Sequence, residues 1–405
     1  MKSNRNFLFL MLGQSLANIG DVLYIVGVIS IIYSLTESAT ASAFVPFTIT
    51  FSMFISSILT PLLIGKFNLK HLLTGSQIGK TVFLFGLGIF LTVGVDSSNF
   101  TLIFLVIALI ALLDGCANPI RQTLIPYYVE EDSLVKANGI AETITQSIQI
   151  GTWFFGSMLL IVFNPNQLIW IVIVLFVFSS IILGVLKNVE NKDETQEKKW
   201  TLLTQGWQTI SSTPLLKTVV RMEFFETIAG SVWIAAILLV YVEQALKAQE
   251  YWWGFINGSF FIGLVVGSLL CIKFSIFVDK NRNVFIITGA FMSCVFTIVF
   301  GLTSFPVIAL ILSTLIGLFG QLKNIPQQTV VQTSVPKEQL ATVYTSLGTI
   351  GTGTFGVASL IMGILSDYFG VRSIFILSGG LLAVVSIMAL KSKDLFRQQL
   401  RKNNI

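Results

Sequence analysis

Acidic side chains lie inside long apolar runs of this chain, where they could bind and release protons. Asp21 lies near the middle of the run 7–34, and Gln14 and Asn18 precede it at helical spacing, so the three form one polar stripe. A carboxylate at the centre of a lipid bilayer costs about 2.5–3.5 kcal/mol on insertion scales, so it is expected to have a role there. A carboxylic acid in a dry cavity can hold a proton at neutral pH and release it when the cavity opens to water. We therefore expect Asp21 to act in proton coupling or substrate binding.

A second polar stripe begins at Glu142, which opens the apolar run 138–163. The same helical face continues through Gln146, Gln149 and Trp153. We interpret Glu142 as a proton-coupling candidate. The two amides and the indole are candidates for lining a substrate cavity.

Two further apolar runs carry acids. Glu226 lies in the first third of the run 216–243 beside Glu223, with Trp233 farther along that face. Asp114 lies one helical turn before Asn118 in the run 101–121. We interpret Glu226 and Asp114 as proton-coupling or cavity candidates and Trp233 as a cavity candidate, with helix–helix hydrogen bonding as the alternative role of each acid.

Other residues are candidates for positioning the substrate or the helices. Asn257 is a polar residue inside an apolar run and could line the cavity. Arg121 lies at the inner end of the run that carries Asp114 and could position a carboxylate. Gly151 and Gly156 could serve gating by allowing helices to pack closely or bend.

The composition identifies the elements that must position these residues. Apolar residues make up 54% of the chain, charged residues 11%, and the mean hydropathy is +0.83, which is typical of a membrane protein. A bilayer core of about 30 Å needs roughly 20 apolar residues per helical span. The sequence predicts an all-α integral membrane protein with twelve transmembrane helices. These lie near residues 7–34, 41–66, 71–94, 101–121, 138–163, 168–187, 216–243, 252–278, 284–303, 306–325, 340–365 and 373–391.

The basic residues predict the orientation of the spans. Of the 25 Lys and Arg residues, only Lys247 and Arg372 fall outside if both termini are cytoplasmic, which agrees with the positive-inside rule. Lys80 and Lys323 are counted on the cytoplasmic side. We interpret Arg372 as the partner of Asp367 in a loop ion pair or turn. The net charge of +5 is thus a sign of topology and does not indicate nucleic-acid binding.

Two loop segments of the chain are similar in sequence. Residues 118–138 read NPIRQTLIPYYVEEDSLVKAN and residues 324–344 read NIPQQTVVQTSVPKEQLATVY, and the segments that follow read IGTWFFG and IGTGTFG. The repetition predicts two pseudo-symmetric six-helix bundles. The expected divisions are an N-terminal bundle at 1–187, a cytoplasmic linker with an amphipathic helix at 188–215, a C-terminal bundle at 216–391 and a basic cytoplasmic tail at 392–405.

The chain resembles the major facilitator superfamily, and within it the bacterial drug:proton antiporters that include macrolide-efflux and siderophore-export proteins. The resemblance lies in GQSLANIGDVLYIVGV at 13–28, in the duplicated loop and in VVQTSVPKEQLATVYTSLGTIG at 330–351. It implies alternating-access export of a small amphipathic organic substrate in exchange for protons. It also implies a monomer surrounded by membrane lipids in the bacterial cytoplasmic (inner) membrane, with both termini cytoplasmic.

Two departures from that family leave an alternative open. The loop GKFNLKHLLTG between the second and third runs lacks the acid usual there, and Ala111 stands where proton-coupled relatives have an Arg. The alternative is a lipid or lysolipid translocator of the same fold without proton coupling. An enzyme is not expected, because His71 is the only histidine and the HExxH, GxSxG and P-loop motifs are absent from the sequence. No cofactor, metal or nucleic-acid partner is expected.

Overall fold

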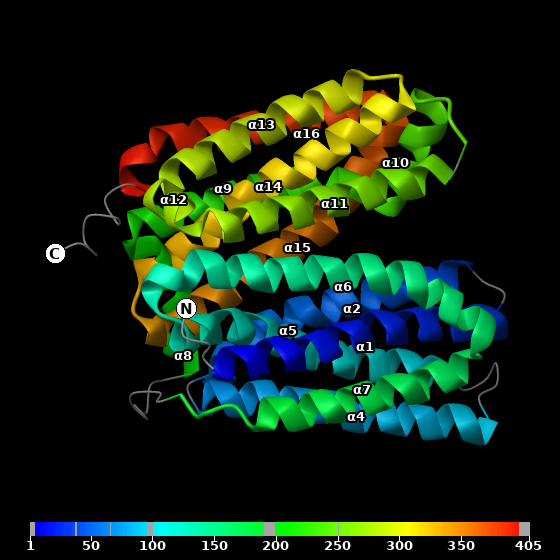
Figure 1. Cartoon of the computed structure of the whole chain (residues 1–405). Helices are drawn as coiled ribbons and strands as arrows, with labels where there is room; N and C mark the ends of the chain where they lie inside the picture. The colour runs from blue at the N-terminus through cyan, green and yellow to red at the C-terminus, as the bar shows by residue number, and fades with distance from the viewer. Residues whose placement is uncertain are drawn as a thin grey trace. The chain divides into compact units, whose positions relative to one another are not determined.

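The described part of the chain folds into helices (Figure 1). The computed structural model describes residues 5–36, 39–64, 66–94, 100–189, 199–249 and 251–396, and this part of the chain contains no strand. Its helices are α1 (Arg5–Thr36), α2 (Ala39–Leu59), α3 (Pro61–Ile64), α4 (Leu69–Gly94), α5 (Thr101–Tyr128), η1 (Glu131–Ser133), α6 (Leu134–Val162), α7 (Pro165–Gly184), α8 (Lys199–Ser212), α9 (Pro214–Gly230), η2 (Ser231–Trp233), α10 (Ala235–Val240), η3 (Tyr241–Ala245), α11 (Tyr251–Lys273), α12 (Ser275–Lys280), α13 (Arg282–Leu302), α14 (Pro306–Ser334), α15 (Lys337–Phe369) and α16 (Val371–Lys391).

The long helices correspond to the predicted membrane spans. Within the described residues, nine helices are long and apolar enough to cross a bilayer: α1, α4, α5, α7, α11, α13, α14, α15 and α16. A broken span adds a tenth, because Pro214–Trp233 and Ile237–Ala245 pass the same test together with a bend of 56°. The 21-residue α2 and the 29-residue α6 occupy the two remaining predicted spans. The prediction of an all-helical membrane fold is confirmed.

The chain divides into two compact units, which we describe separately. Unit 1 and unit 2 each combine three segments of the chain. Unit 1 contains Met1–Val129, Ser147–Gly206 and Lys337–Thr352, and unit 2 contains Glu130–Gln146, Trp207–Pro336 and Gly353–Ile405. The first half of α6 therefore belongs to unit 2, and the first half of α15 belongs to unit 1.

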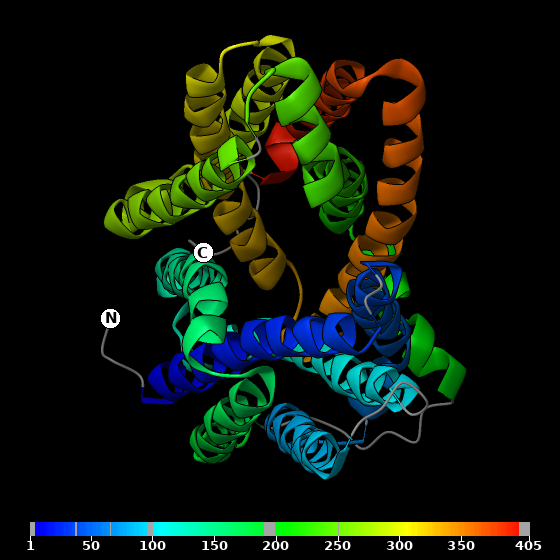
Figure 2. The ribbon, with the colours of Figure 1, turned by 90° about the vertical axis from the view of Figure 1, so that its right-hand side faces the viewer.

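In unit 1, α7 packs along α1, and α4 packs on both α5 and α7 (Figure 2). Small residues allow the approach of α1 to α7, because a Cβ at Gly13 would collide with Leu183 and one at Gly20 with Phe176. The hydroxyl of Ser179 donates to the carbonyl of Gly13 at 2.8 Å. Since lipid tails are as apolar as leucine, such close packing and hydrogen bonding, rather than transfer out of water, stabilises the helix pair.

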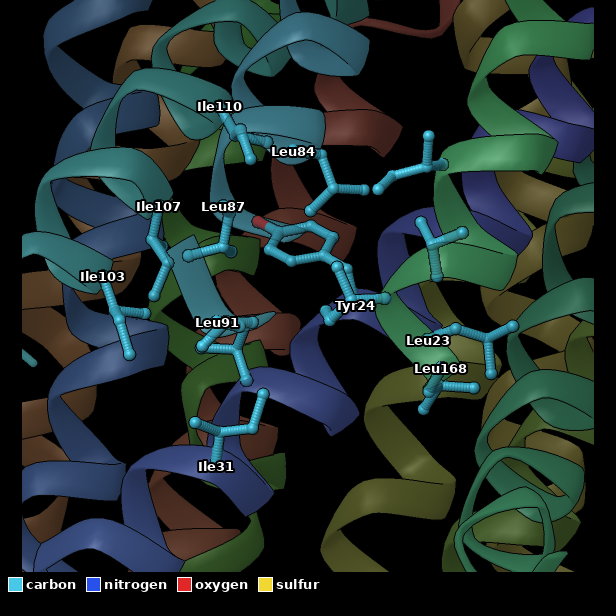
Figure 3. Close-up of a cluster of buried hydrophobic side chains, with 14 of the residues drawn as sticks. Leu23, Tyr24, Ile31, Leu84, Leu87, Leu91, Ile103, Ile107, Ile110 and Leu168 are labelled. Carbon is cyan, nitrogen blue, oxygen red and sulfur yellow. The ribbon is translucent and has the colours of Figure 1, made fainter. Parts of the chain in front are cut away.

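An aliphatic cluster fills the interior of unit 1 (Figure 3). It draws side chains from α1, α2, α4, α5 and α7. The ring of Tyr24 lies among them with Leu84 and Leu87 of α4. Ile107 and Ile110 of α5 lie next to these two leucines. The four aliphatic side chains are fully buried, so the cluster fixes the spacing of α1, α4 and α5.

In unit 2, α14 packs against α11 and α13, and α16 packs against α13 and α9. The α11–α14 crossing depends on two glycines. A Cβ at Gly263 would collide with the carbonyl oxygen of Thr314, and a Cβ at Gly317 would collide with that of Phe260. Glycine at both positions lets the two backbones touch, as in small-residue packing of membrane helices.

The guanidinium group of Arg372 binds the ends of neighbouring helices. Nη1 donates to the carbonyl oxygens of Leu302 and Thr303, both at 2.8 Å, and Nη2 donates to that of Ala245 at 2.7 Å. These carbonyls lie where α13 and η3 end, so their own helices offer them no donor. Of the two predicted roles, the ion pair with Asp367 is not formed, because the helix ends take up the guanidinium donors. The turn is present, since Gly370 with φ 80° separates α15 from α16.

Candidate functional site

Three charged side chains meet inside unit 1, and we call Asp21, Lys80 and Asp114 the N-terminal charge cluster. Lys80 Nζ on α4 lies 2.6 Å from Asp21 Oδ1 on α1 and 2.5 Å from Asp114 Oδ1 on α5. The lysine side chain is 1% exposed, whereas the two aspartates are 23% and 22% exposed. Lys80 Nζ also lies 4.8 Å from the ring centroid of Phe176 on α7. The ammonium is thus enclosed, and the carboxylates remain partly accessible.

Lys80, which was counted on the cytoplasmic side, is a buried residue inside unit 1. The residue lies inside α4, on the face that also buries Leu73, Ser76, Gln77 and Leu84. A lysine is stable there because two carboxylates lie within contact distance, and a buried charge needs such partners. Sequence reasoning could have found it, since Lys80 falls well inside the expected span 71–94.

The charges of the N-terminal cluster do not balance. Two carboxylates and one ammonium leave a net charge of −1 among the groups in contact. The elements that pack on the cluster do not correct this, because neither α2 nor α7 contains a charged residue. Arg121 of α5 acts on Asp21 only through a weaker, longer-range charge interaction. One added proton would make the contacting groups neutral.

The polar stripe of α1 leads away from this cluster. Gln14 and Asn18 are half-buried, as is Asp21, which follows them on the same helical face. The structure therefore combines the predicted stripe with Asp114 at one place in unit 1. Tyr24, one turn beyond Asp21, lies near both carboxylates.

A second group of charges lies in unit 2, and we call Glu223, Glu226 and Lys323 the C-terminal charge cluster. Lys323 Nζ on α14 lies 2.5 Å from Glu226 Oε2 on α9, with side-chain exposures of 4% and 18%. Glu223, on the same helix as Glu226, interacts electrostatically with both. Lys323 was also counted on the cytoplasmic side, and the structure buries its ammonium inside the unit.

Glu142 has different surroundings from the acids of the two clusters. Its carboxylate accepts hydrogen bonds from Gln321 at 3.1 Å and from Gln328 and Gln146 at 3.3 Å, all within unit 2. Three amide donors match the acceptor-only character of an ionised carboxylate. Of the predicted cavity residues, Gln146 thus binds Glu142 directly.

One helical turn before Glu142, a buried amide pair joins α6 to α14. Asn138 Nδ2 donates to Gln332 Oε1 at 2.8 Å, and Gln332 Nε2 donates back to Asn138 Oδ1 at 3.1 Å. Asn138 also donates to the Thr329 hydroxyl at 3.0 Å. These residues were not predicted as site residues, although all three lie in the repeated loop segments 118–138 and 324–344.

The other predicted residues are dispersed. Trp233 packs in an aromatic group, with its ring centroid 4.9 Å from that of Phe300 and 5.5 Å from that of Phe375. Asn257 donates to the carbonyl of Trp253 on its own helix at 3.1 Å.

Four predicted residues lie farther along α6. Gln149 and Gly151 are half-buried on this helix. The side chains of Trp153 and Gly156 lie outside the part of the structure that is described.

Unit 1 also contains an apolar cavity of about 460 Å³ between α2, α4 and α5. Five leucines and one phenylalanine make up half of its lining, and His71 and Cys116 also line it. The lining residues are Ser56, Leu59, Thr60, Leu63, Phe67, His71, Leu72, Gly75, Ser76, Leu112, Leu113 and Cys116. Leu59 and Phe67 are about half exposed, so the cavity opens at the surface of the unit. It does not include the predicted cavity residues of α1.

The described residues contain no group of His, Cys, Asp and Glu side chains that could hold a metal ion. Cys116, Cys271 and Cys294 are free and buried in separate helices. The charged clusters therefore contain ammonium and carboxylate groups alone, and the chemistry they can perform is proton binding and charge pairing.

Comparison with known proteins gives one consistent result. The profile of the Major Facilitator Superfamily matches residues 8–353 and 222–399. The uncharacterized MFS-type transporter YfmI of Bacillus subtilis (strain 168) is 27% identical over 407 residues, which cover 99% of each chain. Two solved structures share the fold. The E. coli fucose:proton symporter FucP has a TM-score of 0.74 at 16% identity, covering 96% of this chain and 97% of that one. The human organic anion transporter MFSD10 has a TM-score of 0.78 at 9% identity, covering 96% and 100%.

Proposed function

Because the chain belongs to the Major Facilitator Superfamily, we propose that it exports amphipathic or lipophilic organic compounds by secondary active transport, in exchange for protons. The observation that supports proton exchange is the N-terminal charge cluster. Two partly exposed carboxylates share one buried ammonium, so the contacting groups are one proton short of neutrality. A net charge inside a membrane is costly, and proton binding removes it.

The charge of the same cluster also indicates which kind of cargo it would accept. A site with a net charge of −1 disfavours an anion and accepts a neutral or weakly cationic compound. A cationic cargo and a proton would compete for the same negative charge, and this competition couples export to proton entry. Gln14 and Asn18 offer hydrogen bonds beside it, and in our proposal they contact the cargo.

For topology and location, the proposal keeps the sequence-based expectations. We propose a monomer in the bacterial cytoplasmic membrane with both termini inside, in which the bundles 1–187 and 216–391 alternate access to the cargo. Reporter fusions test the orientation. A fusion after Val95 should give an external signal and one after Lys199 a cytoplasmic signal, and the reverse pair of signals would contradict the topology.

A second candidate function is favoured by the apolar cavity in unit 1. Its volume of about 460 Å³ and its leucine-rich wall suit an acyl chain. A lipid or lysolipid translocator would use such a cavity and would need no proton. The two candidates differ in their dependence on a pH gradient.

Transport by purified protein in liposomes decides between them. Export of lipophilic cations should accelerate when a pH gradient drives protons in the opposite direction, and it should fall when the gradient is collapsed. Movement of a fluorescent lysolipid that is equally fast with and without the gradient, with no transport of lipophilic cations, would favour the lipid translocator instead.

A further inference from the structure

The C-terminal charge cluster repeats the charge arrangement of the N-terminal one. In each unit, a buried lysine contacts a carboxylate on the first long helix of that half of the chain, α1 or α9. The lysine comes from different helices, α4 in one case and α14 in the other. A second carboxylate belongs to each cluster: Asp114 contacts Lys80 directly, whereas Glu223 interacts with Lys323 electrostatically. The two clusters therefore have the same count of two carboxylates and one ammonium.

The surroundings of the C-terminal cluster do not supply a compensating charge. The helices packed on α14 and α9 carry charged residues only near their ends. These residues are Lys273 on α11, Arg282 on α13, and Arg372 and Lys391 on α16. Arg282 is paired with Asp279 at 2.7 Å. On α9 itself, Lys217 and Arg221 are exposed. Glu142 of α6 is bound by amides of α14. The net charge of −1 on the cluster is thus uncompensated by contact.

A buried glutamine beside the cluster lacks a donor. Gln327 lies one helical turn after Lys323 on α14, and the residue is 5% exposed. No donor among the described residues reaches its Oε1 atom. An unpaired buried acceptor costs about 1–3 kcal/mol. A protonated carboxyl group within reach of this oxygen would supply the O–H donor that an ionised one lacks.

We propose that the C-terminal charge cluster is a second proton-binding site, so that each transport cycle moves two protons, one bound in each unit. The inference rests on the proposed proton exchange and extends it. A proton fits better than a metal cation, because the Lys323 ammonium already occupies the position beside Glu226. Protonation of Glu223 leaves the Glu226–Lys323 pair intact and makes the cluster neutral.

Direct counting of bound protons tests this without any cargo. Purified protein in detergent is titrated with acid through the neutral range in weakly buffered solution, with an indicator dye as the readout. Asp21→Asn leaves a neutral Lys80–Asp114 pair, and Glu223→Gln leaves a neutral Lys323–Glu226 pair. Each variant should bind one proton fewer than the wild-type protein, and the double variant two fewer. Glu243→Gln, at an exposed position of η3, is the control and should bind as many as the wild type.

The outcomes separate the two proposals. If Asp21→Asn loses one proton while Glu223→Gln and Glu226→Gln lose none, the second site is wrong and the proposed proton exchange stands. If Glu223→Gln loses one and Asp21→Asn none, the N-terminal site fails instead. Glu226→Gln provides a second variant of the same cluster should Glu223→Gln fail to elute as a folded monomer in gel filtration.

Discussion

Asp21 of α1 and Asp114 of α5 share the ammonium group of Lys80. Their charge states are therefore linked, because loss of one negative charge leaves the lysine to the other carboxylate alone. The lysine–carboxylate pair that remains has no net charge, so a proton would not neutralise it. The cluster therefore differs from a simple salt bridge. In a simple salt bridge, removal of either partner leaves an unpaired buried charge.

Replacement of Asp21 by Asn should preserve the fold and abolish proton-driven export. Lys80 keeps Asp114 as its partner, so the variant should be produced in normal amounts in the membrane. Its gradient-driven transport should fall by about tenfold or more, equivalent to at least ~1.4 kcal/mol. Liposome flux under a pH gradient measures this, with Ser15→Ala on the same helix as the control. Full gradient-driven transport by Asp21→Asn would remove this residue from the mechanism.

Replacement of Lys80 by Met should destabilise the protein. Two carboxylates would remain without a buried cation, and removal of one partner of a buried pair costs about 3–5 kcal/mol. The added substitution Asp21→Asn should recover part of the loss, since it removes one of the two charges. A thiol-reactive dye reports unfolding, because all three cysteines are buried. The exposed Lys217→Met is the matched control, and equal melting temperatures for Lys80→Met and the control would contradict the buried cluster.

The Asn138–Gln332 pair should contribute a measurable coupling energy. Its two reciprocal hydrogen bonds are buried, and interhelical polar pairs in membranes average about 0.6 kcal/mol with values up to ~1.7 kcal/mol. A double-mutant cycle with Asn138→Leu and Gln332→Leu isolates this term. The stability lost in the double variant should be smaller than the sum of the losses in the two single variants. Strict additivity of the two changes would argue against the pair.

Alanine at Gly263 should weaken the α11–α14 crossing. A Cβ there would collide with the backbone of Thr314, which cannot move aside as a flexible side chain can. Overpacking of this kind costs roughly 1–3 kcal/mol. Gly258 on the same helix has open space around its Cβ direction, so Gly258→Ala is the control. The melting temperature should fall for Gly263→Ala alone.

Filling the apolar cavity separates the exporter from the lipid translocator. Gly75 lines the cavity and has open space at its Cβ, so Gly75→Phe should occupy the volume. Gly86 on the same helix is equally open and does not line the cavity, which makes Gly86→Phe the control. We expect cation export by both variants to equal that of the wild type. A loss of lysolipid movement in Gly75→Phe alone would instead favour the translocator.

The sequence predicts the fold more completely than it predicts the site. Apolar length predicted the spans, because each helix must satisfy its backbone inside lipid. Asp21 could be found by its depth in one span. Lys80 could not be assigned by the positive-inside rule, since that rule counts basic residues without testing how deep they lie. Trp233 shows a similar limit, because helical spacing does not distinguish an aromatic residue that lines a cavity from one that packs in a core.

The Arg372 contacts imply that one end of unit 2 tolerates acid and salt. The guanidinium binds backbone carbonyls of Leu302, Thr303 and Ala245, which are neutral and do not titrate. An arginine paired with a carboxylate would lose its partner on acidification and weaken as ionic strength rises. The hydrogen bonds from Arg372 of α16 to the ends of α13 and η3 should therefore persist over a wide pH range. In our proposal, the two charge clusters bind protons over the same range.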